Sequence, residues 1–422
     1  MGGEVAKNSK IQNPRPSEGQ SKIQNRLRVA LFTYSTKPRG GVVHTLALAE
    51  QLQALGHEVH IYALGKDQQS TFFRPTPVPF TLIPTEPGAA DEPLDERIQR
   101  YIQTYYEFLT HQRPSPIDIY HTQDCISANA LWRIREDGLV PWFVRTIHHI
   151  DDFVSPSLIE CQNHSINRPD HRIVVSQFWQ QRLVAEFGVE STVIYNGVDV
   201  NRFQPASPGE RASARAKLGL AEQLVFLNIG GIEPRKNSLR LLHAFQAARR
   251  ELAAQGRASV LLMAGGDTLL DYAPYRQEFY EALERSKLQP DQDIFLLGVM
   301  SEADLPLLYQ AADILTFPSV KEGWGLVALE ALASGVPVLA SDLPVFREYL
   351  TSGENGLLVD PSDKQAIAAG MLRLVEDDEL RQRLATAGPA TAKRFSWAAT
   401  AKAHVTCYRT FLASDLEPNQ AG

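Results

Sequence analysis

From Leu27 onward the sequence alternates short apolar segments with amphipathic segments, and it completes this pattern twice. The apolar segments have the length of buried strands, and the amphipathic segments place apolar residues at helical spacing. Such alternation is typical of parallel sheets with right-handed helical crossovers. At 422 residues, the chain is long enough for two such domains. We therefore expect an α/β protein with two Rossmann-like, doubly wound parallel sheets that face each other across a cleft.

The expected strands divide into two groups. The first group is 28–35, 58–64, 80–84, 118–121, 142–148, 171–176 and 192–195. The second group is 225–229, 259–264, 294–297, 314–317, 336–340 and 356–359. A Pro- and Gly-rich segment at 205–209 lies between the groups and predicts the boundary between domains 27–204 and 205–394. Residues 395–413 have helical spacing and are expected to pack back across both domains.

The net charge, the N-terminal composition and the cysteine count limit the partners and the compartment that this chain can have. The chain has 42 Lys and Arg against 49 Asp and Glu, a balance that argues against a nucleic-acid partner but leaves peripheral membrane contact through a local patch open. Residues 1–26 are polar, lack the apolar core of a signal peptide and are expected to be a disordered tail. The cysteines number three, which disfavours a disulfide framework and favours a cytoplasmic location.

The segment from Phe317 to Val338 carries the most chemical information. An expected strand ends at Phe317, a loop with Gly323 and Gly325 follows, and an expected helix begins near Gly325. Backbone N–H groups at such a helix start favour an anion such as a diphosphate. Glu322 and Glu330 flank this element and could accept hydrogen bonds from sugar and ribose hydroxyls. The alternative is that both glutamates are ordinary surface acids.

A pair of cations follows the first strand of the second group. Arg235 and Lys236 stand at the point where that strand leads into a helix. Two cations at this strand end could hold a diphosphate and stabilise the charge that develops when it leaves. The alternative is a solvated Arg-Lys pair on the surface.

Histidines mark the strand ends of the first group. His121 and His148 end two expected strands, and His149 and Asp151 follow. These residues could contact a ligand, stabilise the strand ends by hydrogen bonds, or hold a metal ion, although the spacing matches no strong zinc signature. The first loop reads Arg39-Gly40-Gly41 instead of Gly-x-Gly-x-x-Gly, which counts against a dinucleotide oxidoreductase.

Taken together, these residues resemble the retaining glycosyltransferases of family 4, which have the GT-B fold. The resemblance extends from about Leu27 to Leu412. Its motifs are Gly40-Gly41, Thr146-Ile-His148, Asn196-Gly-Val-Asp199, Glu233-Pro-Arg-Lys236, Ala264-Gly-Gly-Asp267, the Glu322 to Glu330 element and Asn355-Gly-Leu-Leu-Val-Asp360. The resemblance implies a nucleotide-diphosphate sugar on the C-terminal domain and an acceptor on the N-terminal domain.

The resemblance also implies a role for each matching residue. Arg235 and Lys236 would stabilise the departing diphosphate without a metal or other cofactor, and His148 and Glu322 would contact the donor sugar. The remaining donor-binding residues implied by the family are Gly40, Gly41, Gly265, Val299, Met300, Trp324, Gly325, Leu326 and Glu330. Among these, Glu330 would accept from the ribose, and the backbone near Val299 and Met300 would border the base.

The chain departs from the family pattern at several positions. Gly231 stands where many relatives have Arg, and Asn237 where many have Gly, which puts the number of cations on the diphosphate in doubt. His149, Asp151 and Asp152 are unusual beside His148, and whether they form an acceptor site is left open. The Pro-rich, acidic segment 66–115 is interpreted as a mobile loop over the cleft.

We therefore expect a retaining, metal-independent transferase that moves a sugar to a hydroxyl of a small-molecule, lipid or glycan acceptor. The alternatives are a sugar-nucleotide epimerase or hydrolase on the same fold, a binding protein without turnover, and a metal-dependent hydrolase built on His148, His149 and Asp151. The base, the sugar and the acceptor are not specified by the sequence.

Overall fold

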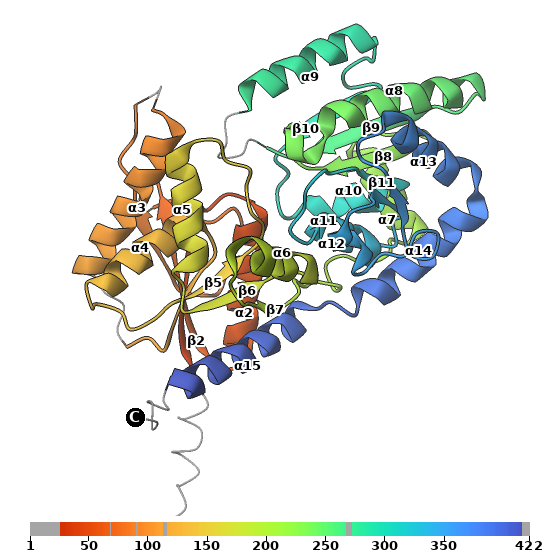
Figure 1. Ribbon diagram of the computed structural model, residues 1–422. Helices are drawn as coiled ribbons and strands as arrows, with labels where there is room; N and C mark the ends of the chain where they lie inside the picture. The colour runs from red at the N-terminus through yellow and green to blue at the C-terminus, as the bar shows by residue number, and fades with distance from the viewer. Residues whose placement is uncertain (1–25, 68, 90–91, 113–115, 267–271, 416–422) are drawn as a thin grey trace, which may run out of the picture.

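The computed structural model describes residues 26–415 apart from residues 68, 90–91, 113–115 and 267–271. It contains two parallel sheets, one of seven strands and one of six, each between layers of helices (Figure 1). The predicted fold class is confirmed, and every expected strand has a counterpart in the structure. The expected tail, residues 1–26, lies almost entirely outside the described residues.

The N-terminal sheet has the strand order β3-β2-β1-β4-β5-β6-β7. Its strands are β1 (Arg28–Thr33), β2 (Glu58–Gly65), β3 (Phe80–Pro84), β4 (Ile119–Thr122), β5 (Val144–Ile147), β6 (His171–Val174) and β7 (Thr192–Val193). Its helices are α2 (Gly40–Ala54), α3 (Leu94–His111), α4 (Cys125–Glu136), α5 (Pro156–Asn167) and α6 (Gln177–Phe187). Strand β1 pairs in parallel with β2 and β4, so the strand order reverses between β1 and β4.

The C-terminal sheet has the order β10-β9-β8-β11-β12-β13 and reverses between β8 and β11. Its strands are β8 (Leu224–Ile229), β9 (Ser259–Ala264), β10 (Ile294–Gly298), β11 (Ile314–Phe317), β12 (Val338–Ser341) and β13 (Leu357–Val359). Its helical elements are α7 (Pro208–Lys217), η1 (Pro234–Lys236), α8 (Ser238–Ala254), α9 (Ala273–Ser286), α10 (Leu305–Ala311), α11 (Leu326–Ala333), α12 (Pro344–Arg347), α13 (Lys364–Glu376) and α14 (Asp378–Ala392).

These two reversals matter because ligands of doubly wound sheets bind outside the carboxyl ends of the strands, at the point where the strand order reverses. In the N-terminal domain that point lies between the chain segments that follow β1 and β4. In the C-terminal domain it lies between the segments that follow β8 and β11. The predicted residues Arg235 and Lys236 follow β8, and Glu322 follows β11.

The segment 66–115 corrects one expectation. Its described part contains β3, which was expected, and the helix α3 in place of a mobile loop. Ile98, Ile102, Tyr105 and Leu109 are buried along one side of α3, at the helical spacing that packs it on the sheet. The acidic and Pro-rich residues beside this stripe mask the periodicity in the sequence.

The C-terminal helix α15 (Trp397–Asp415) returns to the N-terminal domain (Figure 1). Ala401, Val405, Tyr408 and Phe411 are buried in the same apolar cluster as α2 and β1. The chain passes from one domain to the other twice, and the two connecting segments touch at Gly197. A Cβ atom on Gly197 would lie 2.2 Å from the Trp397 nitrogen, so a side chain cannot fit there.

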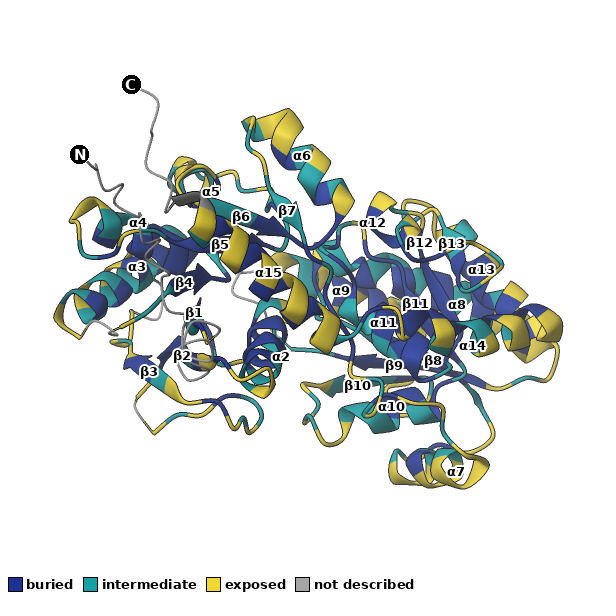
Figure 2. Cartoon of the chain, turned by 90° about the horizontal axis from the view of Figure 1, so that it is seen from below, coloured by how far each residue is buried: buried dark blue, intermediate teal, exposed yellow. Residues whose placement is uncertain are grey.

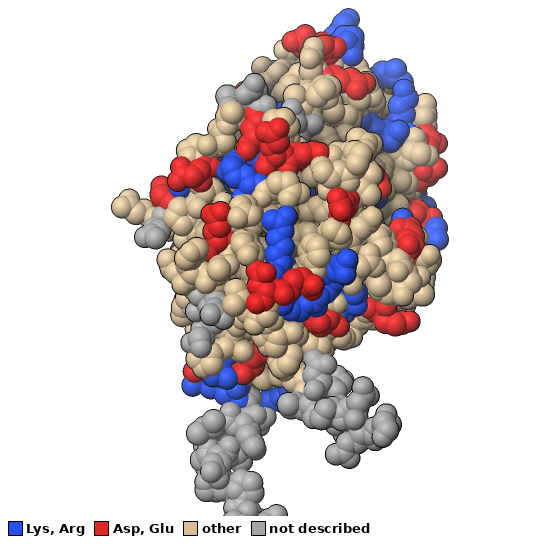
Figure 3. Space-filling model, turned by 60° about the vertical axis from the view of Figure 1, so that its left-hand side comes forward, with Lys and Arg blue, Asp and Glu red and all other residues tan. Residues whose placement is uncertain are grey.

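Burial follows the two sheets, whose strands are largely buried while the outer sides of the helices are exposed (Figure 2). Acidic and basic side chains are interspersed on the face seen in Figure 3. Within the described residues, none of the helices combines the length and apolar character needed to cross a membrane.

Candidate functional site

Two cations and a buried carboxylate form the centre of the site at the carboxyl edge of the C-terminal sheet. Lys236 Nζ lies 2.6 Å from Glu322 Oε1, and Arg235 Nη1 lies 3.3 Å from the same oxygen. Arg235 Nη2 also contacts Glu233 Oε1 at 2.9 Å. The Lys236 ammonium lies 4.6 Å from the ring centroid of Phe317, the last residue of β11. The structure therefore brings together three of the predicted site residues, Arg235, Lys236 and Glu322.

Glu322 is charged in this setting. Its side chain is only 7% exposed, and burial opposes ionisation. The neighbouring Lys236 and Arg235 nevertheless hold the pKa of its carboxyl below the ordinary value. The carboxylate thus serves as the counter-ion for both cations, a position that phosphate oxygens can take over because Arg and Lys bind both groups.

The loop after Glu322 approaches the N-terminal domain closely. A Cβ atom on Gly323 would lie 2.3 Å from the His148 carbonyl oxygen, so only glycine fits there. Gly325 has a φ of 88° and precedes Leu326, the first residue of α11. The Ala328 N–H already donates to the Gly325 carbonyl oxygen at 3.0 Å. The N–H groups of Leu326 and Val327, which precede it, have no carbonyl partner within the helix and can bind an anion.

Trp324 holds this loop in place. Its side chain is buried, stacks on Tyr195 at a centroid distance of 4.6 Å and packs against Tyr349. The Tyr349 hydroxyl donates to the Trp324 carbonyl oxygen at 3.0 Å. The buried Trp324 side chain therefore anchors the loop between the two domains.

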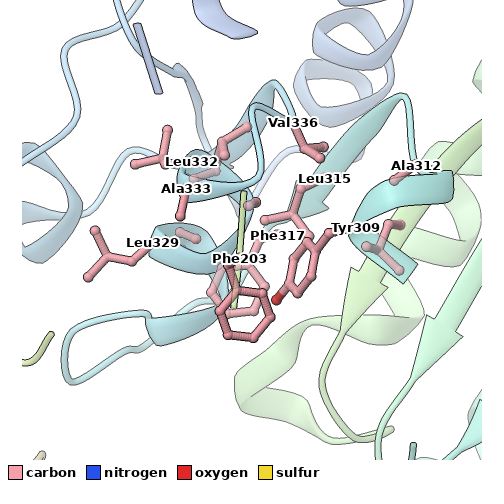
Figure 4. Packing of buried hydrophobic residues seen from close by; sticks show 14 of the residues in the cluster. Phe203, Tyr309, Ala312, Leu315, Phe317, Leu329, Leu332, Ala333 and Val336 are labelled. Atoms are coloured by element: carbon pink, nitrogen blue, oxygen red, sulfur yellow. The ribbon is translucent and has the colours of Figure 1, made fainter. Parts of the chain in front are cut away.

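Glu330 lies in α11 beside a tyrosine from α10. The Tyr309 hydroxyl donates to Glu330 Oε2 at 2.6 Å. Tyr309 packs against Phe203 and belongs to the apolar cluster that includes Phe317 (Figure 4). Burial raises the pKa of Glu330 to about 7. At neutral pH this carboxyl can accept a hydrogen bond, and protonation changes it into a donor.

Three further residues expected to bind the donor, Gly265, Val299 and Met300, lie after the ends of β9 and β10. Gly265 has a φ of 151°, and a Cβ atom there would lie 2.4 Å from the Gly230 carbonyl oxygen. Val299 is 59% exposed, whereas Met300 packs partly against the core. The exposed Val299 side chain can offer apolar contact to a ligand.

The structure gives physical reasons for the two departures from the family pattern. A Cβ atom on Gly231 would lie 2.6 Å from the Gly266 carbonyl oxygen, so an arginine does not fit this conformation. Asn237 has a φ of 61°, the left-handed region that glycine or asparagine adopts most readily. Its side-chain amide donates to the Pro318 and Pro361 carbonyl oxygens, and this ties the cation segment to β11.

The N-terminal part of the site contains the predicted residues Gly41 and His148. Gly40 and Gly41 open α2, and a Cβ atom on Gly41 would lie 3.6 Å from the His148 ring. His148 Nε2 lies 3.1 Å from Gln123 Oε1, and its ring packs edge-on against His44 at 4.9 Å. Burial holds the pKa of His148 well below the ordinary value, so the ring is neutral at pH 7.

Among the roles left open for His121, the structure shows that of a structural hydrogen-bonding residue. His121 is fully buried within β4, and its ring nitrogens contact Tyr408 Oη and Thr146 Oγ1. The strand continues one residue beyond it, so its side chain joins the core beneath α15. His121 therefore cannot contact a ligand directly.

The residues after His148 do not form a metal centre in the described structure. His149 Nε2 lies 3.2 Å from Asp151 Oδ1, while Asp152 pairs with Lys321. Among residues the structure describes, His, Cys, Asp and Glu side chains form no group of three or more placed to hold a metal ion.

Contacts between the domains include residues that sequence reasoning missed. Lys321 Nζ donates to the Ile150 carbonyl oxygen at 3.2 Å, and Trp179 Nε1 donates to the Glu322 carbonyl oxygen at 3.0 Å. Glu348 accepts hydrogen bonds from the first N–H groups of α6, at 3.0 and 2.9 Å. In the sequence, only the position of Lys321 directly before Glu322 pointed to one of these contacts.

Comparisons with known proteins agree on the family. Residues 38–202 match the model described as Glycosyltransferase Family 4, and residues 210–391 match the model described as Glycosyl transferases group 1. D-inositol 3-phosphate glycosyltransferase from Corynebacterium urealyticum is 26% identical over 91% of this chain and 96% of its own length. O-antigen chain mannosyltransferase B from Escherichia coli is 32% identical over 60% of this chain and 66% of its own length.

Solved structures share the fold at lower identity. Sucrose-phosphate synthase from Thermosynechococcus elongatus matches with a TM-score of 0.76 and 22% identity, covering 92% of this chain and 100% of the other. HepE from Anabaena, solved in complex with UDP-glucose, matches with a TM-score of 0.71 and 21% identity over 92% of this chain and 100% of the other.

Proposed function

The chain belongs to the family 4 glycosyltransferases, and from this premise we propose that it moves a sugar from a nucleotide-diphosphate sugar to an acceptor hydroxyl. We propose further that the reaction retains the anomeric configuration and needs no metal ion. The observation that carries this proposal is the cluster of Lys236, Arg235 and Glu322 beside the glycine loop that opens α11. The UDP-glucose in the related Anabaena protein supports a nucleotide-sugar donor.

The cluster fits a diphosphate leaving group. Arg235 and Lys236 supply the positive charge, and the N-terminus of α11 supplies N–H donors. As the bond to the sugar breaks, negative charge grows on the diphosphate, and these groups stabilise it. Such preorganised charge stabilisation can supply much of a rate enhancement. In this proposal the arginine and lysine do the work that a metal ion does elsewhere.

Deprotonation of the acceptor needs no strong base in this scheme. The leaving phosphate oxygen lies on the same face of the sugar as the incoming hydroxyl and takes its proton. This geometry produces retention. Glu322, held as a carboxylate by two cations, would accept a hydrogen bond from a donor-sugar hydroxyl. Glu330, at the side of α11 near Tyr309, would accept from the ribose.

A thermal-shift panel of nucleotide sugars tests the donor. A ligand at 100 times its dissociation constant adds about 2.7 kcal/mol to the free energy of unfolding. We expect at least one nucleotide sugar, and its free nucleoside diphosphate, to raise the melting temperature, while the matching free sugar does not. Absence of any shift across the panel would contradict the proposal.

The same donor tests the reaction type. Incubation with donor alone should release the sugar slowly, in the anomeric configuration of the donor, and the rate should survive addition of EDTA. Rapid and complete consumption without acceptor favours a hydrolase or epimerase. An inverted product contradicts retention, and loss of the rate in EDTA contradicts metal independence.

The compartment is also a proposal. The three cysteines, Cys125, Cys161 and Cys407, are free in the structure. Free thiols persist in a reducing environment, so we propose that the enzyme works in the cytoplasm. Mass spectrometry of freshly isolated protein should find all three thiols reduced, and a disulfide would contradict this placement.

A further inference from the structure

A line of hydrogen-bonded side chains leads from His148 to the C-terminal helix. His148 Nε2 lies 3.1 Å from Gln123 Oε1, and Gln123 Nε2 lies 3.3 Å from His121 Nε2. His121 Nδ1 lies 2.7 Å from the hydroxyl of Tyr408 in α15. The line therefore joins three segments that are distant in sequence: the segment after β5, the end of β4, and α15.

The donor and acceptor chemistry of glutamine fixes the proton positions along this line. The amide oxygen of Gln123 can only accept, so His148 must carry its proton on Nε2. The amide nitrogen of Gln123 can only donate, so His121 Nε2 must be unprotonated. The proton of neutral His121 is then on Nδ1, which donates to the Tyr408 oxygen.

Water has little access to this line. His121 and Tyr408 are 0% exposed, and Gln123 is 4% exposed. The Thr146 hydroxyl, 2.8 Å from His121 Nε2, supplies a second donor to the same lone pair. A buried polar group that loses its partner is not rescued by solvent, so each member of the line constrains the next.

The His148 ring is also fixed from its other sides. Gly41 leaves room for it, and the His44 ring packs against it at 4.9 Å. The His148 carbonyl oxygen touches Gly323 of the loop that carries Glu322. His148, at one end of this line of hydrogen bonds, therefore lies against the loop of the C-terminal domain that carries Glu322 and Gly323.

We propose that Tyr408, His121 and Gln123 are positioning residues, which hold His148 in its Nε2–H tautomer and keep Nδ1 as the acceptor for a hydroxyl of the transferred sugar. The inference rests on the proposed donor site, because it names the His148 atom that contacts the sugar. It assigns the C-terminal helix a role in sugar recognition that its packing alone does not require.

Nitrogen NMR of the imidazoles tests the positioning directly and needs no substrate. With all histidines ¹⁵N-labelled, and His121→Gln and His148→Gln used for assignment, we expect the Nδ1–H form at His121 and the Nε2–H form at His148. Tyr408→Phe keeps the buried ring and removes only the hydroxyl. In this variant we expect the Nε2–H form to appear at His121 and the signals of His148 to shift toward a mixture of tautomers. Opposite tautomers in the wild type, or unchanged tautomers in Tyr408→Phe, would overturn the proposal.

Binding of UDP-glucose and UDP tests the consequence. Loss of one hydrogen bond should weaken UDP-glucose binding by roughly two- to tenfold in Tyr408→Phe and leave UDP binding unchanged. If Tyr408→Phe does not fold, Gln123→Met takes its place, because it removes both amide hydrogen bonds and keeps a side chain of similar length. It should also weaken UDP-glucose binding and leave UDP binding unchanged. Equal weakening of both ligands, or of neither, would contradict the role in sugar recognition.

Tyr105→Phe is the matched control. Tyr105 is a fully buried tyrosine of the N-terminal domain, and its hydroxyl lies 2.5 Å from the Thr33 carbonyl oxygen and 3.0 Å from the Tyr62 carbonyl oxygen. We expect this variant to lose stability without any change in the tautomers of His121 and His148 or in UDP-glucose binding. A change in either tautomer in this variant would contradict the proposed positioning role. If the wild type binds neither UDP nor UDP-glucose, the UDP-sugar donor is rejected, while the NMR result still decides the positioning.

Discussion

The two sides of the site differ in chemistry: Glu322 and its two cations form buried ion pairs on the C-terminal side (the ionic side), whereas Gln123 and His44, which contact the His148 ring on the N-terminal side, are neutral (the neutral side). On the first side, Glu322 is shared between Lys236 and Arg235. On the second, His148 is held by Gln123 through directional contacts. Ion pairs tolerate exchange of one anion for another, so the first side suits a diphosphate that binds and leaves. Directional contacts preserve one geometry, so the second side suits recognition of hydroxyls.

Replacement of Lys236 should give the largest effect on the ionic side. Lys236→Ala removes a donor aimed at the charge that develops on the diphosphate, and we expect turnover to fall by roughly 10² to 10³. Steady-state kinetics of sugar release measures this. Lys364→Ala, an exposed lysine at the start of α13, is the control. Unchanged turnover in a folded Lys236→Ala enzyme would refute the assigned role.

Loss of the shared carboxylate should reduce stability. Glu322→Gln leaves Lys236 beside Arg235 without their common counter-ion, and breaking a buried pair of this kind costs about 3 kcal/mol. Urea unfolding should show the decrease, and saturating UDP should restore part of it by supplying a new anion. Glu222→Gln, at an exposed position, is the control. If UDP stabilises the variant less than the wild type, phosphate does not replace the Glu322 carboxylate as the counter-ion of Lys236 and Arg235.

Glu330 should make stability depend on pH. Its pKa is raised from 4.5 to about 7 in the folded protein, so the folded state binds the proton more tightly than the unfolded state. The corresponding stability is fully present below pH 4.5 and is lost as pH rises through 7, by about 2 to 3 kcal/mol. Unfolding free energies of the wild type and Glu330→Gln at pH 5 and pH 8 measure the difference. A difference between the two proteins that does not change with pH would exclude this raised pKa.

Contacts between the domains should matter least. Glu348→Gln weakens the carboxylate cap on α6, and we expect a loss of about 0.5 to 1 kcal/mol in unfolding free energy. Glu354→Gln, on the nearby exposed turn, is the control. A loss above about 2 kcal/mol would show that this contact does more than cap a helix.

The two sides also differ in how far the sequence predicts them. The ionic side follows from local segments, because Arg235 and Lys236 follow one strand and Glu322 follows the strand that pairs with it. Parallel strands that end in such residues bring them to one edge of the sheet. The strand pattern itself was clear, and all expected strands are present.

The neutral side depends on contacts across long stretches of sequence. His121 and Tyr408, for example, are 287 residues apart. No local period encodes such pairs, so the sequence left the role of His121 undecided and Tyr408 was missed. Helix α3 was missed for another reason, since the Pro-rich, acidic composition of its neighbourhood hid the spacing of Ile98, Ile102, Tyr105 and Leu109.

A crystal structure of the complex with UDP tests the central claim most directly. The account predicts diphosphate oxygens within hydrogen-bond distance of Lys236 Nζ and the Arg235 guanidinium, at the N-terminus of α11, with the ribose beside Glu330. A diphosphate bound away from Lys236, or a ribose far from Glu330, would contradict it.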